Sequence, residues 1–148
     1  MIELTKQIEE GLMVAADMQR SGDMDGARAK YRALLDDVAT DDADAATVLH
    51  LLAVIVDDPQ SKLELNIESL ERAEKAAPNN FPAEMKSSIF ANIGYSHREL
   101  GDLEEARAWY MRARATADAL PDDDYGARLR ENTQRELDAL DARIAEIR

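Results

Sequence analysis

The amino-acid sequence predicts an all-α fold, a solenoid of antiparallel helix pairs. The first observation behind this prediction is composition: the helix formers Ala, Leu, Glu and Arg recur along all 148 residues, whereas aromatic residues make up 5% of the chain and there are 6 Gly and 4 Pro, so β-architectures are disfavoured. The second is a segment near the N-terminus that is repeated later in the chain. Because a repeat stack buries one continuous core between neighbouring helices, we expect a single domain over residues 1–148.

The internal repeat has a constant offset of 79 residues. The matching segments are Gly22-Asp23-Met24 with Gly101-Asp102-Leu103, Ala27-Arg28-Ala29 with Ala106-Arg107-Ala108, and Tyr31 with Tyr110. This offset accommodates two helical-hairpin units of about 34 residues each and a few inserted residues. Three units are therefore expected, near residues 8–41, 44–79 and 83–120, followed by a C-terminal helix over 122–147.

The first unit is predicted to form helices near 2–20 and 24–39. Gly22 stands between them, where the left-handed turn that often ends a helix favours glycine. Asp23 follows as the expected N-cap, because a side-chain oxygen there accepts a hydrogen bond from one of the N–H groups that the first turn leaves unpaired.

The middle unit is predicted to form helices near 44–57 and 62–77. Two apolar stripes at helical spacing support it, Leu49, Leu52, Ala53 and Val56 in the first helix and Ile67, Leu70, Ala73 and Ala77 in the second. Ser61-x-x-Glu64 has the pattern of a capping box, and Pro78 follows the second stripe as a stop signal.

The third unit is predicted to form helices near 83–100 and 103–119, separated by Gly101 and a second capping box, Asp102-x-x-Glu105. The last helix, 122–147, begins with three consecutive acids and carries one apolar side, Leu129, Leu137, Leu140, Ile144 and Ile147. A repeat stack needs such a helix to cover its last apolar face, so we interpret it as a cap. The spacing of its last four apolar residues also suits a short coiled coil, which leaves homodimerisation as the alternative.

The three units resemble the tetratricopeptide repeat, in which small residues let two helices approach while large residues fill the adjacent groove. The third unit matches best, with Phe90, Ile93, Gly94 and His97, then Ala106, Tyr110 and Ala113. In the first unit Gly11 stands where a large residue is usual, and in the middle unit Asn66 replaces a small Ala. The resemblance implies a right-handed superhelix and a protein that binds another polypeptide.

In this family the first helix of each unit lines the concave surface, so the resemblance implies a peptide-binding site there. The residues expected to form it are Leu12, Met13, His50, Leu51, Val54, Asn92, Tyr95 and Arg98. An apolar patch with polar edges suits an extended or helical peptide, because burial supplies affinity and hydrogen bonds supply register. The alternative is that several of these apolar residues pack within the stack.

Charge and residue types exclude other classes of function. The formal net charge of −13 repels nucleic acid and anionic membranes. The longest apolar stretch, residues 51–56, is too short to span a bilayer, and the N-terminus lacks the pattern of a signal peptide, so a cytoplasmic location is expected. With no Cys and with two His in different units, we expect no catalytic residues, no metal site, no cofactor and no enzymatic activity.

The leading functional hypothesis is therefore an adaptor or interaction module whose concave face binds a peptide segment of another protein. Two alternatives remain open. One is a self-associating structural protein that dimerises through its C-terminal helix, and the other is a small secretion-type tetratricopeptide chaperone.

Overall fold

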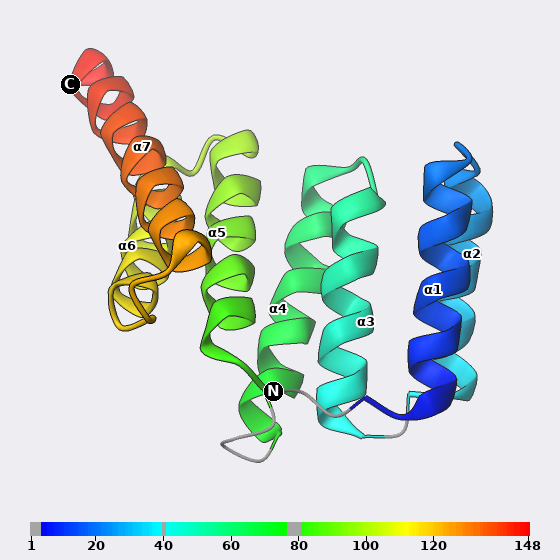
Figure 1. Ribbon diagram of the computed structural model, residues 1–148. Helices are drawn as coiled ribbons and strands as arrows, with labels where there is room; N and C mark the ends of the chain where they lie inside the picture. Colours follow the sequence, from blue (N-terminus) through cyan, green and yellow to red (C-terminus); the bar gives the residue numbers. More distant parts are fainter. Residues whose placement is uncertain (1–3, 40, 77–80) are drawn as a thin grey trace. The chain divides into compact units, whose positions relative to one another are not determined.

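The computed structural model describes residues 4–39, 41–76 and 81–148, and these residues form seven α-helices and no strand (Figure 1). The helices are α1 (Lys6–Arg20), α2 (Met24–Asp37), α3 (Asp42–Ile55), α4 (Pro59–Lys75), α5 (Ala83–Glu99), α6 (Leu103–Asp118) and α7 (Asp124–Ile147). The predicted all-α class is confirmed. The main differences are that α1 begins four residues after its predicted start and α4 three residues before. Ala77 and Pro78, predicted to end α4, lie outside the described residues.

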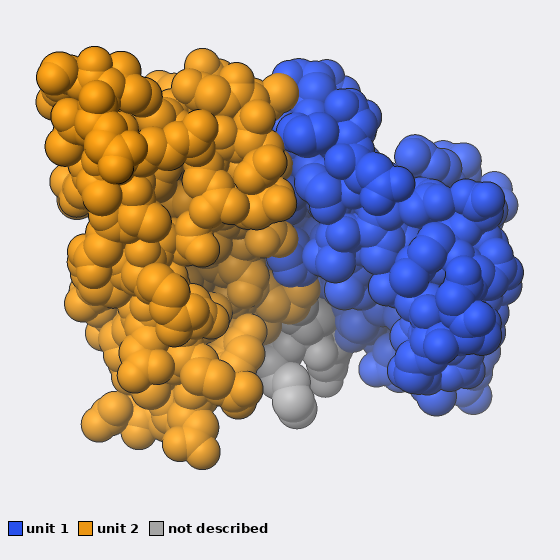
Figure 2. All heavy atoms as spheres, turned by 90° about the horizontal axis from the view of Figure 1, so that it is seen from above, with its two compact units in different colours: residues 1–81 blue, residues 82–148 orange. Residues whose placement is uncertain are grey.

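The chain divides into two compact units, Met1–Phe81 and Pro82–Arg148, shown in different colours in Figure 2. In unit 1, α1 packs on α2, α2 on α3, and α3 on α4. In unit 2, α5 packs on α6, and α7 lies along α6 with a smaller contact to α5 (Figure 1). Each unit therefore contains the antiparallel helix pairs that the repeat predicted.

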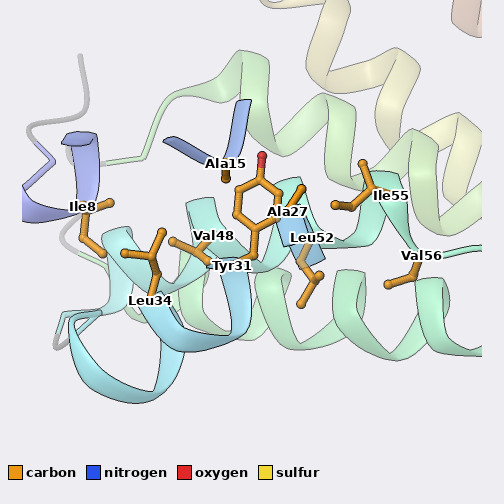
Figure 3. Close-up of a cluster of buried hydrophobic side chains, with 9 residues drawn as sticks. All are labelled: Ile8, Ala15, Ala27, Tyr31, Leu34, Val48, Leu52, Ile55 and Val56. Carbon is orange, nitrogen blue, oxygen red and sulfur yellow. The ribbon is translucent and has the colours of Figure 1, made fainter. Parts of the chain in front are cut away.

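The core of unit 1 is an apolar cluster drawn from α1, α2, α3 and the residue after α3. Figure 3 labels its members: Ile8, Ala15, Ala27, Tyr31, Leu34, Val48, Leu52, Ile55 and Val56. The ring of Tyr31 lies in the middle of the labelled side chains. Burying a large aliphatic side chain stabilises a fold by roughly 1.5–3 kcal/mol, so the fully buried Ile8 and Leu52 hold α1 and α3 in this arrangement.

The exceptional glycine of the first unit, Gly11, is explained by packing. A Cβ atom placed on Gly11 would lie 2.4 Å from the Cδ2 atom of Leu34, so Leu34 of α2 occupies the space that a larger residue at position 11 would need. The positions related by the repeat offset in unit 2 are Phe90 and Ala113, both buried. The two hairpins thus carry the large and the small residue in opposite order at these two positions, with the large residue on α2 in the first hairpin and on α5 in the other.

The turns after α1 and α5 have the geometry that the sequence predicted. Gly22 and Gly101 have φ angles of +86° and +88°, the left-handed conformation that other residues rarely adopt. Asp23 caps α2, because its carboxylate accepts a hydrogen bond from the Gly26 N–H at 2.8 Å.

Both predicted capping boxes are wrong. In α4 the N-cap is Asp58, whose Oδ2 atom accepts hydrogen bonds from the Ser61 N–H at 3.0 Å and the Ser61 hydroxyl at 2.8 Å. Pro59 then occupies the first helical turn, where a missing N–H costs nothing, and this starts the helix earlier than predicted. Asp102 makes no capping bond; its carboxylate lies 3.6 Å from the Nδ1 atom of His97.

Helix α7 covers α6 with its apolar side. Leu137 and Leu140 are 7% and 1% exposed and join a cluster with Leu103, Ala106 and Tyr110 of α6. Ile144 packs partly against the same cluster, whereas Ile147 is 71% exposed. This is the arrangement that a cap requires, and it buries inside unit 2 two of the four residues that a coiled-coil dimer would use.

Asp44, near the start of α3, is a fully buried carboxylate. Its Oδ1 atom accepts a hydrogen bond from the Thr5 N–H at 3.4 Å, and its Oδ2 atom has no partner among the described residues. Burial raises the pKa of Asp44, and the neighbouring Asp41 carboxylate raises it further. A carboxylate with a raised pKa in the folded state stabilises the fold only while it holds its proton.

We therefore expect Asp44→Asn to stabilise unit 1 at neutral pH. The contribution of Asp44 is present below its unfolded pKa of about 3.9 and is lost as the pH rises through the higher folded pKa. The melting temperature of the variant should exceed that of the wild type by roughly 3 °C or more at pH 7, and the gap should close toward about pH 4. Glu68→Gln on the exposed face of α4 is the control for the change in net charge. A variant that melts below the wild type at pH 7 contradicts the prediction.

Candidate functional site

The residues predicted to bind a peptide belong to three helices in two units. Leu12 and Met13 lie on α1, and His50, Leu51 and Val54 lie on α3, all in unit 1. Asn92, Tyr95 and Arg98 lie on α5 in unit 2.

In unit 1 the predicted apolar residues have two different roles. Met13 and Val54 are 68% and 54% exposed, so both are free to contact a partner. Leu12 and Leu51 are only partly exposed and pack against the core cluster of Figure 3. The alternative of packing within the stack therefore applies to Leu12 and Leu51, and among the predicted residues of these two helices Met13 and Val54 carry the exposed apolar surface.

His50 contributes a neutral imidazole beside this surface. Burial lowers the pKa of His50, and the side chain of Asn66 opposes that shift. The Nδ1 atom of His50 and the Oδ1 atom of Asn66 are both buried without a hydrogen-bond partner among the described residues. Near pH 7, His50 therefore acts in this unit through packing rather than through charge.

In unit 2 the predicted residues Asn92 and Tyr95 line a cleft of about 260 Å³ between α5 and α7. The opposite wall comes from α7 and includes Asn132, Thr133 and Glu136. The family resemblance places the site on the first helix of each unit and therefore does not predict these residues. Nothing in the α7 segment itself indicates that its polar side faces α5.

Arg98 does not line this cleft itself, but it contacts two residues that do, Glu136 and Tyr95. Its Nη1 atom donates to the Oε2 atom of Glu136 at 2.5 Å, and its guanidinium carbon lies 4.8 Å from the centre of the Tyr95 ring. The charge of Arg98 is therefore balanced inside unit 2, and the residue joins α5 to α7 and positions Tyr95.

Tyr110 of α6 also lines the cleft. It is 3% exposed, and a Cβ atom on Gly94 would lie 2.8 Å from its Cδ2 atom, so the absence of a side chain at Gly94 lets the ring pack against the α5 backbone. Burial raises the pKa of Tyr110 far above its usual value, and the charge of Glu136 adds to this effect. The Tyr110 hydroxyl therefore keeps its proton and is available as a hydrogen-bond donor.

The outer side of α6 and α7 carries a larger groove of about 550 Å³, but ion pairs cross it. Arg107 donates to Asp141 at 2.6 Å, and Arg148 pairs with Glu104. These contacts fix α7 to α6 and leave the charges of the groove paired.

The described residues hold no group of three or more His, Cys, Asp and Glu side chains placed to bind a metal ion. None of their helices has both the length and the apolar composition needed to cross a membrane.

Comparison with known proteins places the chain in a structural class. No family model and no curated protein matches it by sequence. Its fold is that of an all-α helical-repeat protein, because two crystal structures can be superposed on nearly the whole chain.

The similar structures are both of PcrH. The structure of PcrH in complex with the chaperone-binding region of PopD has a TM-score of 0.66 and 22% identity, covering 97% of this chain and 98% of that chain. The structure of PcrH from Pseudomonas aeruginosa has a TM-score of 0.62 and 21% identity, covering 94% of this chain and 96% of that chain. At this level of identity the likeness shows the shared fold.

Proposed function

We propose that this protein is a small secretion-type chaperone of the tetratricopeptide kind that binds a peptide segment of another protein and performs no catalysis. The observation that carries the proposal is the match in fold to PcrH, which was crystallised with the chaperone-binding region of PopD. The match extends over nearly the full length of both chains, so it includes every helix that holds a predicted binding residue.

The exposed side chains support peptide binding over a purely structural role. Met13 and Val54 present apolar surface on α1 and α3, and Asn92 and Tyr95 border a cleft on α5. Apolar anchors beside a few hydrogen-bonding groups are typical of peptide sites, because the anchors supply affinity and the polar groups supply register.

Self-association through α7 is the weaker alternative. A coiled-coil dimer would need Leu137 and Leu140 at its interface, and both side chains are buried against α6. We infer that α7 acts as a cap on the repeat stack and that the functional partner is a different polypeptide.

The charge of the chain indicates which segments it prefers. A net charge of −13 repels acidic peptides and attracts neutral or basic ones, and salt screens both effects. We therefore expect bound segments to combine apolar residues with a neutral or positive net charge.

A peptide array tests the proposal. The probes are overlapping 15-residue peptides that cover the proteins encoded by neighbouring genes, and binding is compared between the wild type and Val54→Asp. Val54 is 54% exposed, so this substitution should leave the fold intact, unlike one at the partly buried Leu51. Removing an apolar anchor worth roughly 1.5–3 kcal/mol and adding a charge should weaken binding by about tenfold or more.

Met111→Asp is the matched control, because Met111 is 48% exposed on α6 and gains the same charge away from the proposed surface. It should bind the array peptides as the wild type does, and circular dichroism should show equal helix content in all three proteins. If no peptide is retained, or if Val54→Asp binds as tightly as the wild type, the proposal is wrong.

A further inference from the structure

The two tyrosines related by the internal repeat have different hydrogen-bond partners. The Tyr31 hydroxyl donates to the Oε1 atom of Gln19 at 2.5 Å, from the second helix of the first hairpin to the first. At the repeat offset, Gln19 corresponds to Arg98 and Tyr31 to Tyr110. A guanidinium has no acceptor, and no described residue hydrogen-bonds to the Tyr110 hydroxyl.

The unpaired hydroxyl belongs to a side chain that is held in place. Tyr110 is 3% exposed, with its ring against Gly94, and it forms part of the wall of the α5–α7 cleft. The hydroxyl is not among the buried polar atoms of the described residues that lack a partner, so it keeps contact with solvent in the cleft that Tyr110 lines. The cleft therefore contains a fixed donor that an acceptor on a ligand would satisfy.

The rest of the cleft indicates what kind of acceptor fits. Arg98 and Glu136 neutralise each other at 2.5 Å, so no free cation is available to a ligand carboxylate there. Asn92 and Asn132 offer amides from opposite walls, and each amide can both donate and accept. A peptide backbone has the complementary alternation of N–H and C=O groups.

The size of the cleft agrees with a short stretch of chain. Its volume of about 260 Å³ lies below the roughly 300–1,000 Å³ that pockets for drug-sized ligands occupy. Its two walls run along two helices, which leaves it open at the surface and accessible to an extended segment.

We propose that the Tyr110 hydroxyl donates a hydrogen bond to a main-chain carbonyl of the bound peptide and thereby sets the register of that peptide in the α5–α7 cleft. This inference rests on the proposed function, since it assigns one donor within the peptide site. It makes Tyr110 a binding residue, whereas its counterpart Tyr31 is a structural one.

The two tyrosines related by the repeat, Tyr31 and Tyr110, provide a matched control. Tyr110→Phe removes an unpaired hydroxyl, so its melting temperature should equal or exceed that of the wild type, while the affinity for the tightest array peptide should fall about three- to tenfold. Tyr31→Phe breaks the bond to Gln19, so its melting temperature should fall while its affinity stays unchanged. The opposite pattern, or equal affinity of Tyr110→Phe and the wild type, overturns the inference.

A second probe does not depend on the array. N-acetyl-leucine N-methylamide, a single capped residue, is titrated at millimolar concentration while NMR follows the side-chain amides of Asn92 and Asn132. We expect these signals to shift, with a several-fold weaker midpoint in Tyr110→Phe and no change in Tyr31→Phe. The corresponding methyl ester, whose carbonyl is a poorer acceptor, should bind the wild type less tightly than the amide, and this difference should shrink in Tyr110→Phe.

The outcomes separate the two proposals. If array peptides bind in a Val54-dependent manner but neither probe responds to Tyr110→Phe, the inference is overturned and the proposed function stands. If no array peptide binds while the capped leucine binds in a Tyr110-dependent manner, the proposed function fails and the assignment of the donor stands. If the capped leucine shifts neither Asn92 nor Asn132, the cleft is not a peptide site and the inference is wrong.

Discussion

Leu140→Ala is expected to lower the free energy of unfolding of unit 2 by about 2–5 kcal/mol, whereas Ile147→Ala should change it by less than about 0.5 kcal/mol. Leu140 of α7 is 1% exposed and packs against α6, and Ile147, two turns further along the same apolar side of α7, is 71% exposed. Trp109 of α6, the only tryptophan in the chain, provides a fluorescence signal specific to this unit during urea unfolding.

The same pair of variants distinguishes a cap from a dimer. Light scattering should give one molar mass for the wild type and Ile147→Ala, because the exposed isoleucine has no partner to lose. If α7 instead formed a coiled coil between two copies, Ile147→Ala would lower the mass and destabilise the protein in a concentration-dependent way. Either observation contradicts the cap.

The second large effect is expected at Gly11 and Leu34, which pack against each other in the first hairpin. Leu34→Ala removes a side chain that is 3% exposed and should cost about 2–5 kcal/mol. Gly11→Phe forces a ring into the space that Leu34 fills, where even a Cβ atom would lie 2.4 Å from the Cδ2 atom of Leu34, and should cost about 1–3 kcal/mol or more.

The double variant Gly11→Phe with Leu34→Ala reproduces the Phe90–Ala113 pair of unit 2 and should recover most of the lost stability. Circular dichroism during urea unfolding measures the three variants. The interaction energy of the double-mutant cycle should be large and favourable, because the two changes compensate in one space. Additive losses would mean that the two positions do not share that space.

The fold was predictable because its determinants are local or repeated. The apolar spacing of Leu49, Leu52, Ala53 and Val56 is a property of a few turns of chain, and the match of Gly22 with Gly101 locates two hairpins at once. Helix starts were less predictable, since Asp58 and Ser61 are both good caps and only Pro59 in the first turn favours the earlier start. The structural reason for a glycine at position 11 could not be inferred, because it depends on Leu34 in the next helix.

The candidate site was predictable only in part for a similar reason. Asn92 and Tyr95 follow from their helix, but the wall that faces them depends on how α7 crosses α5. Leu51 and Val54 have the same residue class and neighbouring positions, yet one packs on the core and the other faces solvent. Tyr110 matches a core position of its repeat, and its free hydroxyl becomes evident only when the partner of Tyr31 is known.

The exchange of Gly11 and Leu34 for Phe90 and Ala113 also has a consequence for assembly. Two hairpins with similar sequences in one chain can mispair, either within one molecule or by exchanging helices between two molecules. If α1 paired with α6, Gly11 would face Ala113 across a void, and if α5 paired with α2, Phe90 would collide with Leu34. Each helix is thus compatible with its own neighbour and penalised with the other, which protects a repetitive protein against domain-swapped aggregates.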